Sequence, residues 1–181
     1  MSPESPDPGA LERQALEDFR AGRRAAAAEG FRTAQDRYLA LGDRLRAAQA
    51  ANNLSVALLQ SGRAPEALQA VEGTPEVFAQ AGDELRRAEA LGNWAAALEA
   101  VGRLDEAERR YREAAEMFQG QGRPDEEAHT RRALAAVLLR LGQPYGATSA
   151  MQRALESDPR GGWKNRWLRR ILDALSRRGG V

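Results

Sequence analysis

Glycine recurs along this chain at a fixed interval of 40 residues, in the two series Gly22, Gly62, Gly102, Gly142 and Gly42, Gly82, Gly122. Five residues after each glycine of the first series stands an alanine (Ala27, Ala67, Ala107, Ala147), and four residues further stands a bulky apolar side chain (Phe31, Val71, Tyr111, Met151). A fixed period of this length is typical of a duplicated supersecondary unit that packs mainly on its neighbours. It favours an extended binding surface over a catalytic pocket.

Length and composition suit one soluble domain. The chain has 181 residues, of which 43% are hydrophobic and 29% charged, enough for a sizeable core. No apolar run approaches the length of a membrane span, and the start MSPESPDPGA has neither the basic nor the apolar part of a secretory signal. Cysteine is absent, which excludes disulfides and cysteine-ligated zinc. We therefore expect a cytoplasmic protein.

Apolar residues at helical spacing predict helices over 43–61, 83–101 and 123–141. Pairs four residues apart form a stripe on one face of each segment: Leu54 and Leu58, Trp94 and Leu98, Leu134 and Leu138. Each segment stops at a glycine, which takes the positive φ of a helix C-terminus at little cost. Asp43 and Asp83 can cap the following helix, and Pro124 suits a first helical turn.

A second helix follows each of these glycines. Its small residue, such as Ala67 or Ala107, lets the two helices of a pair approach closely, and the larger Val71 or Tyr111 lies on the same face. Each unit is then a helical hairpin that cannot bury its apolar face alone. The sequence predicts an all-α, right-handed α-solenoid of four antiparallel helical hairpins plus a C-terminal capping helix.

These small, aromatic and glycine positions resemble the tetratricopeptide repeat family, and Pro159 matches the proline that ends a repeat of that family. The 40-residue period resembles the long-helix branch found in kinesin light chain and in GoLoco-binding adaptors. Asn53-Leu54 and Asn93-Trp94 match the Asn-Leu that this branch carries in the first helix, whereas the third copy has Ala133-Leu134. The resemblance covers roughly residues 10–160 and implies a scaffold fold used by many unrelated systems.

The expected organisation is a disordered segment over 1–8, four repeats over 9–42, 43–82, 83–122 and 123–160, and a basic amphipathic helix over 161–178. The first helix of the first copy is more polar than its counterparts, as suits a terminal unit. Residues 72–75, Glu-Gly-Thr-Pro, interrupt a segment that is helical in the other copies. We predict a kink or break there, with Thr74 capping a new helix that starts at Pro75. The break could act as a hinge or a partner contact, but a tolerated irregularity without a function is the favoured interpretation.

The inner face of the stack is the main candidate site. Side chains opposite the buried stripes of the first helices are predicted to lie on or near a peptide-binding groove: Gln49, Asn52, Asn53, Gln60, Glu89, Asn93, Glu99, His129, Arg132 and Arg140. The resemblance implies that Asn53 and Asn93 hold a partner peptide, because amides both donate to and accept from an extended backbone. The alternative is that each asparagine only bonds a neighbouring helix.

Charge along this face changes from acidic Glu89 and Glu99 to basic His129, Arg132 and Arg140. Such a gradient could orient a charged peptide, but ordinary solvated helix faces with pairs four residues apart are the favoured explanation. The repeats contain no lysine, which disfavours the lysine and arginine clamp used for acidic C-terminal tails.

The last segment is strongly basic, with seven arginines and lysines from Arg160 onward against Asp173 alone. Its apolar side chains fall on one side of the predicted helix: Trp163, Trp167, Leu168, Ile171, Leu172 and Leu175. A capping helix is the favoured interpretation, because open solenoid ends need covering. The alternative is recruitment to nucleic acid or to an anionic membrane surface.

No catalytic, metal-binding or cofactor-binding set is predicted. His129 is the sole histidine and has no evident nucleophile or ligand partners. The glycines are spaced as repeat punctuation and not as a phosphate loop. The expected partner is another protein, bound as an extended segment or helix, and self-association through an uncovered face is a further possibility.

Overall fold

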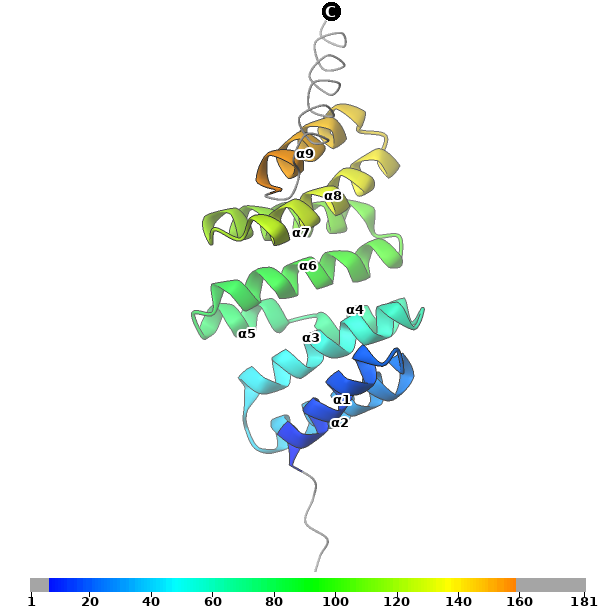
Figure 1. Ribbon diagram of the computed structural model, residues 1–181, viewed down its shortest axis with the longest axis vertical. Helices are drawn as coiled ribbons and strands as arrows, with labels where there is room; N and C mark the ends of the chain where they lie inside the picture. The colour runs from blue at the N-terminus through cyan, green and yellow to red at the C-terminus, as the bar shows by residue number, and fades with distance from the viewer. Residues whose placement is uncertain (1–6, 159–181) are drawn as a thin grey trace, which may run out of the picture. The chain divides into compact units, whose positions relative to one another are not determined.

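The computed structural model describes residues 7–158, and within this range the chain forms nine helices and no strand (Figure 1). This confirms the all-α prediction. The contacts divide the chain into two compact units, one ending at Val101 and one beginning at Gly102. The first unit contains α1 (Pro8–Arg20), α2 (Arg24–Ala40), α3 (Arg44–Gln60), α4 (Ala64–Val71), α5 (Thr74–Gln80) and α6 (Glu84–Ala100). The second contains α7 (Leu104–Gly120), α8 (Pro124–Arg140) and α9 (Pro144–Ser157).

The glycine series set the helix lengths. All seven glycines have a φ between 63° and 83°, which favours glycine because it has no Cβ. At a typical turn the N–H of Asp43 donates to the Tyr38 carbonyl at 2.9 Å while the N–H of Gly42 donates to Leu39 at 3.0 Å, the paired bonds of a Schellman motif. A helix of 17 residues and a three-residue turn together make 20 residues, half of the repeat.

The helix starts agree with the predicted caps. Asp43 and Asp83 each accept a hydrogen bond from a backbone N–H three residues later, at 3.0 Å in both cases. Pro124 is the first residue of α8, where a missing N–H costs nothing. The aspartate in front of α1, Asp7, makes the same kind of cap, which the sequence analysis did not identify.

The small and large repeat positions form the core of each unit. In the first unit Ala27, Phe31, Ala67 and Val71 are buried together with Leu54 and Leu58. In the second unit Ala107, Tyr111 and Ala147 are buried, whereas Met151 keeps partial exposure. Close-packed alanines bring helices together and the larger residues fill the space between them.

The helix after Gly62 is interrupted, as predicted. Figure 1 shows α4 and α5 joined by a short link, in which Gly73 has a φ of 80°. Pro75 has no N–H to donate to the Val71 carbonyl, and the Thr74 hydroxyl donates to that carbonyl instead, at 2.8 Å. The predicted role of Thr74 as a cap was wrong: Gly73 occupies the N-cap position and Thr74 is the first residue of α5.

Two terminal predictions fall largely outside the described range. Asp7 caps α1 and Pro8 is its first residue, while the remainder of the predicted disordered segment precedes the described residues. The predicted capping helix over 161–178, with Trp163, Trp167, Leu168, Ile171, Leu172 and Leu175, follows them.

Candidate functional site

A single solvent-accessible stripe runs along α3. Between Ala47 and Gln60 its members are Gln49, Asn53, Val56, Leu59 and Gln60, and all other residues of this stretch are buried. Spacings of four, three and four residues keep these side chains on one helix face. The predicted groove residues of α3 therefore share one face, except for Asn52, which is 4% exposed.

The equivalent positions of α6 are also accessible. Glu89, Asn93 and Ala96 are half-buried, 40 residues after Gln49, Asn53 and Val56. Gly92 and Trp94 add partial exposure on either side of Asn93. The first unit thus presents two accessible stripes of the same register, and each carries one asparagine amide at the same position.

Both asparagines form a hydrogen bond to the first helix of the preceding repeat. The Asn53 side-chain N–H donates to Glu12 Oε1 at 3.5 Å, and the Asn93 side-chain N–H donates to Asn52 Oδ1 at 2.9 Å. Each acceptor lies 41 residues before its donor, so the bond repeats from α1–α3 to α3–α6. The bond to a neighbouring helix, raised as an alternative above, is therefore present. It uses one N–H of each amide and leaves a second N–H and the carbonyl oxygen for a ligand.

Glu12 anchors this arrangement and was not identified from the sequence. Its other oxygen accepts from the Tyr38 hydroxyl at 3.1 Å, and burial, together with the Glu12 charge, raises the pKa of Tyr38. Arg46 lies 5.8 Å from the Tyr38 ring centre, within reach of a cation–π contact. A shift of 40 residues aligns Glu12 with Asn52. This repeat position was the feature of the sequence from which Glu12 could have been identified.

The remaining candidates of the first unit differ in their surroundings. Gln60 is exposed and accepts from Arg24 Nε at 2.9 Å. Gln49 is half-buried, and its Oε1 is enclosed without a hydrogen-bond partner among the described residues. Glu89 is half-buried. A buried amide oxygen without a donor is unfavourable.

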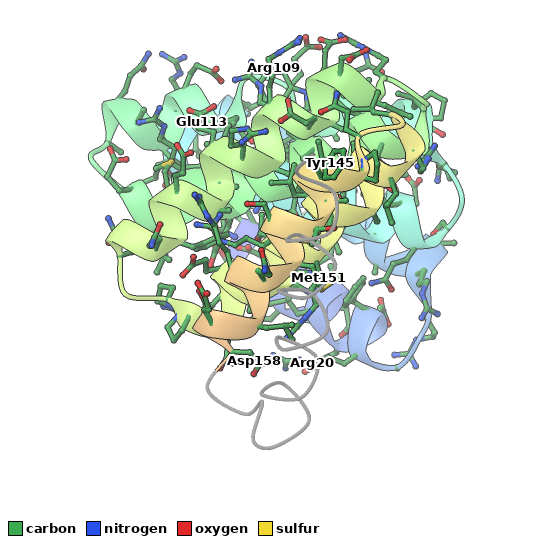
Figure 2. The ribbon with its side chains drawn as sticks, turned by 90° about the horizontal axis from the view of Figure 1, so that it is seen from above. Arg20, Arg109, Glu113, Tyr145, Met151 and Asp158 are labelled. Carbon is green, nitrogen blue, oxygen red and sulfur yellow. The ribbon has the colours of Figure 1, made fainter. Side chains whose placement is uncertain are left out.

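In the second unit the candidates lie along α8. His129, Arg132 and Arg140 are all exposed, at positions equivalent to the stripe of α3 or next to it. Arg132 forms an ion pair with Asp158, which Figure 2 shows at the end of α9, opposite the end that carries Tyr145. The sequence analysis did not anticipate the ion pair of Arg132.

No cluster of three or more histidine, aspartate or glutamate side chains within residues 7–158 could hold a metal ion. None of the helices described combines the length and apolar character needed to cross a bilayer.

Comparison with known proteins gives a family match. Residues 86–160 match the tetratricopeptide repeat model, and no curated protein matches the chain. Among solved structures, BtubC (BKLC) from P. vanneervenii superposes with a TM-score of 0.75 at 23% identity, over 86% of this chain and 66% of that one. This chain thus spans just under two thirds of the BtubC chain.

A second similar structure is that of the nearly identical TPR-like repeats of a candidate kinesin light chain from Podosopora anserina. It has a TM-score of 0.66 and 14% identity and covers 97% of this chain and 100% of that one. At these identities the two likenesses concern the fold alone. They agree with the resemblance expected from the repeat positions.

Proposed function

Because residues 86–160 match the tetratricopeptide repeat model, we propose that the chain is a non-catalytic protein-interaction scaffold that holds an extended partner segment along the accessible stripes of α3 and α6. One observation carries the proposal: Asn53 and Asn93 occupy the same stripe position, and a side-chain hydrogen bond to the first helix of the preceding repeat orients each amide. A fixed amide is pre-organised, so less side-chain entropy is lost when a ligand binds.

The chemistry of the stripes suits a peptide backbone. An amide with one N–H already bonded offers the other N–H to a backbone carbonyl and its oxygen to a backbone N–H. Such contacts hold an extended segment without demanding a particular sequence. Glu89, one turn before Asn93 and half-buried, adds negative charge that would favour a basic side chain in the partner.

The test is a binding measurement on the double variant Asn53→Ala/Asn93→Ala. Peptides are selected from a displayed random library on the wild-type chain, then synthesised and titrated by fluorescence anisotropy. We expect the double variant to bind stripe-directed peptides with an affinity lower by about tenfold or more, the loss typical of removing central contacts.

Two controls separate binding from folding. Gln121→Ala removes an exposed amide at the end of α7, outside the stripes, and should leave the affinity unchanged. Circular dichroism and thermal melting of the double variant show whether loss of the bonds to Glu12 and Asn52 disturbs the helices. Unchanged affinity in a folded double variant would refute the proposed role of the asparagines.

A further inference from the structure

The other side of α3 carries a second surface. A hollow of about 250 Å³ lies over α3, between α2 and the α4–α5 interruption. Its floor is Ala47, Ala48 and Ala51, and its walls include Leu39 and Val77. Ala51 and Asn53 are two residues apart and point about 200° apart around the helix, so the hollow is separate from the asparagine stripe.

Small side chains at two repeat positions create the hollow. The floor position of Ala51 is occupied by Leu91 one repeat later and by Arg131 two repeats later. The wall position of Gly73 is occupied by Glu113 and Arg153 in the same copies. The repeat backbone alone therefore does not leave this space, which comes from Ala51, Gly73 and the break that Gly73 allows.

Exposed leucines continue this surface at the α2–α3 turn. Leu39, Leu41 and Leu45 are 52%, 71% and 39% exposed. The positions equivalent to Leu39 and Leu41 hold Ala79 and Ala81 one repeat later and Gln119 and Gln121 two repeats later. The position of Leu45 holds Leu85 and then Asp125. A cluster of large exposed apolar side chains beside a hollow is typical of an interaction site.

Opposite charges mark the two ends of the hollow. Arg44 lines the end near the leucines, and Glu72 lines the end near Ala51. Both residues are exposed, and neither side chain makes a hydrogen bond or an ion pair with another described residue. An occupant with the reverse order of charges would pair with both, which selects one orientation.

The geometry points to a docking site for a short amphipathic segment of another protein. One large apolar side chain enters the hollow, a neighbouring apolar residue covers the leucines, and an acidic and a basic side chain flank them to meet Arg44 and Glu72. The hollow is smaller than the roughly 300–1,000 Å³ of small-molecule sites, which fits a single side chain better than a metabolite. This surface does not depend on the proposed role of Asn53 and Asn93.

The first experiment uses the full chain and a displayed random peptide library. Selected peptides are titrated against three variants: Ala51→Leu, which fills the hollow with the residue of the next copy; Leu39→Gln/Leu41→Gln, which installs the residues of the copy after that; and Asn53→Ala/Asn93→Ala. We expect peptides with a large apolar residue to lose affinity about tenfold or more on the first two variants and to keep it on the third. Ala136→Leu, at an exposed position of α8, is the matched control.

A charge exchange tests the orientation. Arg44→Glu should weaken the selected peptides severalfold, and replacing their acidic residue by lysine should restore binding. Arg20→Glu, an exposed arginine at the end of α1, should have no effect. Because Leu39 and Leu41 are exposed, their variants keep the test valid even if Ala51→Leu disturbs folding.

Three outcomes would overturn the inference. Equal affinity of selected peptides for the leucine variants would exclude this surface. Loss of binding confined to the asparagine variant would assign the peptides to the α3–α6 stripes. A concentration-dependent dimer in solution that the leucine substitutions abolish would show that a second copy covers the surface.

Discussion

The stretch of α3 that forms the floor of the hollow has an equivalent stretch in α8. Both stretches are helical, but their side chains differ. In α3 the two floor positions hold Ala47 and Ala51, beneath a hollow of about 250 Å³. In α8 they hold Glu127 and Arg131, beside a smaller hollow of about 110 Å³ that Arg131 itself lines. The helices recur in each copy, whereas the side chains at these positions, together with Gly73 and the break it allows, determine whether the space between the helices is open or filled.

In α8 an ion pair occupies the two floor positions. Arg131 Nε lies 2.7 Å from Glu127 Oε1, and the two side chains are 4% and 7% exposed. A second guanidinium nitrogen donates to Gln119 Oε1 at 3.1 Å. A buried charge pair tolerates loss of one partner poorly, whereas the alanine floor of α3 contains no charge that needs a partner. Recognition is therefore expected at the alanine floor and rigidity at the ionic one.

The largest expected effect is that of breaking the ionic floor. Arg131→Ala leaves the Glu127 carboxylate buried without its partner and should lower the free energy of unfolding by about 3–5 kcal/mol. Glu127→Ala/Arg131→Ala, which copies the floor of α3, should recover much of that loss. Urea denaturation measures both. Arg132→Ala, at the exposed neighbouring position, should change stability by about 0.5 kcal/mol or less; a similar loss there would mean that burial of Arg131 is not the cause.

The interruption beside the alanine floor provides the next comparison. Thr74→Val keeps the shape of the side chain but leaves the Val71 carbonyl without its donor, and should cost about 1–3 kcal/mol. Thr148 also donates to a helix carbonyl, that of Pro144 at 2.9 Å, but at an exposed site. Thr148→Val should cost little because water replaces the bond. Equal losses measured by thermal melting would contradict the importance of the interruption.

Local conformation was predictable wherever a backbone position strongly favours one residue type. The glycines fix the helix ends because they accept a positive φ, and Asp43 and Asp83 fix helix starts because a carboxylate accepts from backbone N–H groups. Gly73 and Pro75 predicted the interruption, because glycine accepts a positive φ and proline has no N–H to continue a helix. The detailed role of Thr74 was missed, because its hydroxyl serves a carbonyl that only the break leaves unpaired.

Contacts between helices were harder to predict. Periodicity identified the accessible stripe of α3, but it did not separate buried Asn52 from half-buried Asn53, since the two are adjacent in the sequence. The hydrogen bonds that Glu12 accepts and the hollow above Ala51 depend on how helices cross. They emerge only when side chains of different copies are compared at one repeat position within a known fold.

The starts of α6 and α8 extend the comparison to smaller effects. Asp83 accepts the Arg86 N–H at 3.0 Å, whereas the residue before α8, Arg123, gives no side-chain cap. Asp83→Ala should therefore cost about 1 kcal/mol. Asp36→Ala, at an exposed position inside α2, should stay within about 0.5 kcal/mol of wild type. A loss of equal size at Asp36 in urea denaturation would show that net charge, and not capping, is responsible.

The smallest expected effect is a dependence on acid pH. At three helix starts an arginine before the helix bonds a glutamate three residues later: Arg63 and Glu66, Arg103 and Glu106, Arg123 and Glu126. In each pair the arginine hydrogen bond is the main cause that lowers the pKa of the glutamate below its ordinary value of 4.5. The stabilisation is thus complete above that ordinary value and is lost as the pH falls through the lowered pKa of the folded state.

Thermal melting from pH 7 to pH 3 checks this dependence. The melting temperature should hold steady down to about pH 5 and then decline, and Glu66→Gln/Glu106→Gln/Glu126→Gln should flatten the decline while lowering the plateau slightly. The effect is small because the pairs are largely exposed and water screens them. Because one of the three pairs stands at the start of α8 and the other two at the starts of α4 and α7, single variants show whether the ionic floor of α8 amplifies its own terminal pair. An unaltered acid slope in the triple variant would assign the acid sensitivity to other carboxylates.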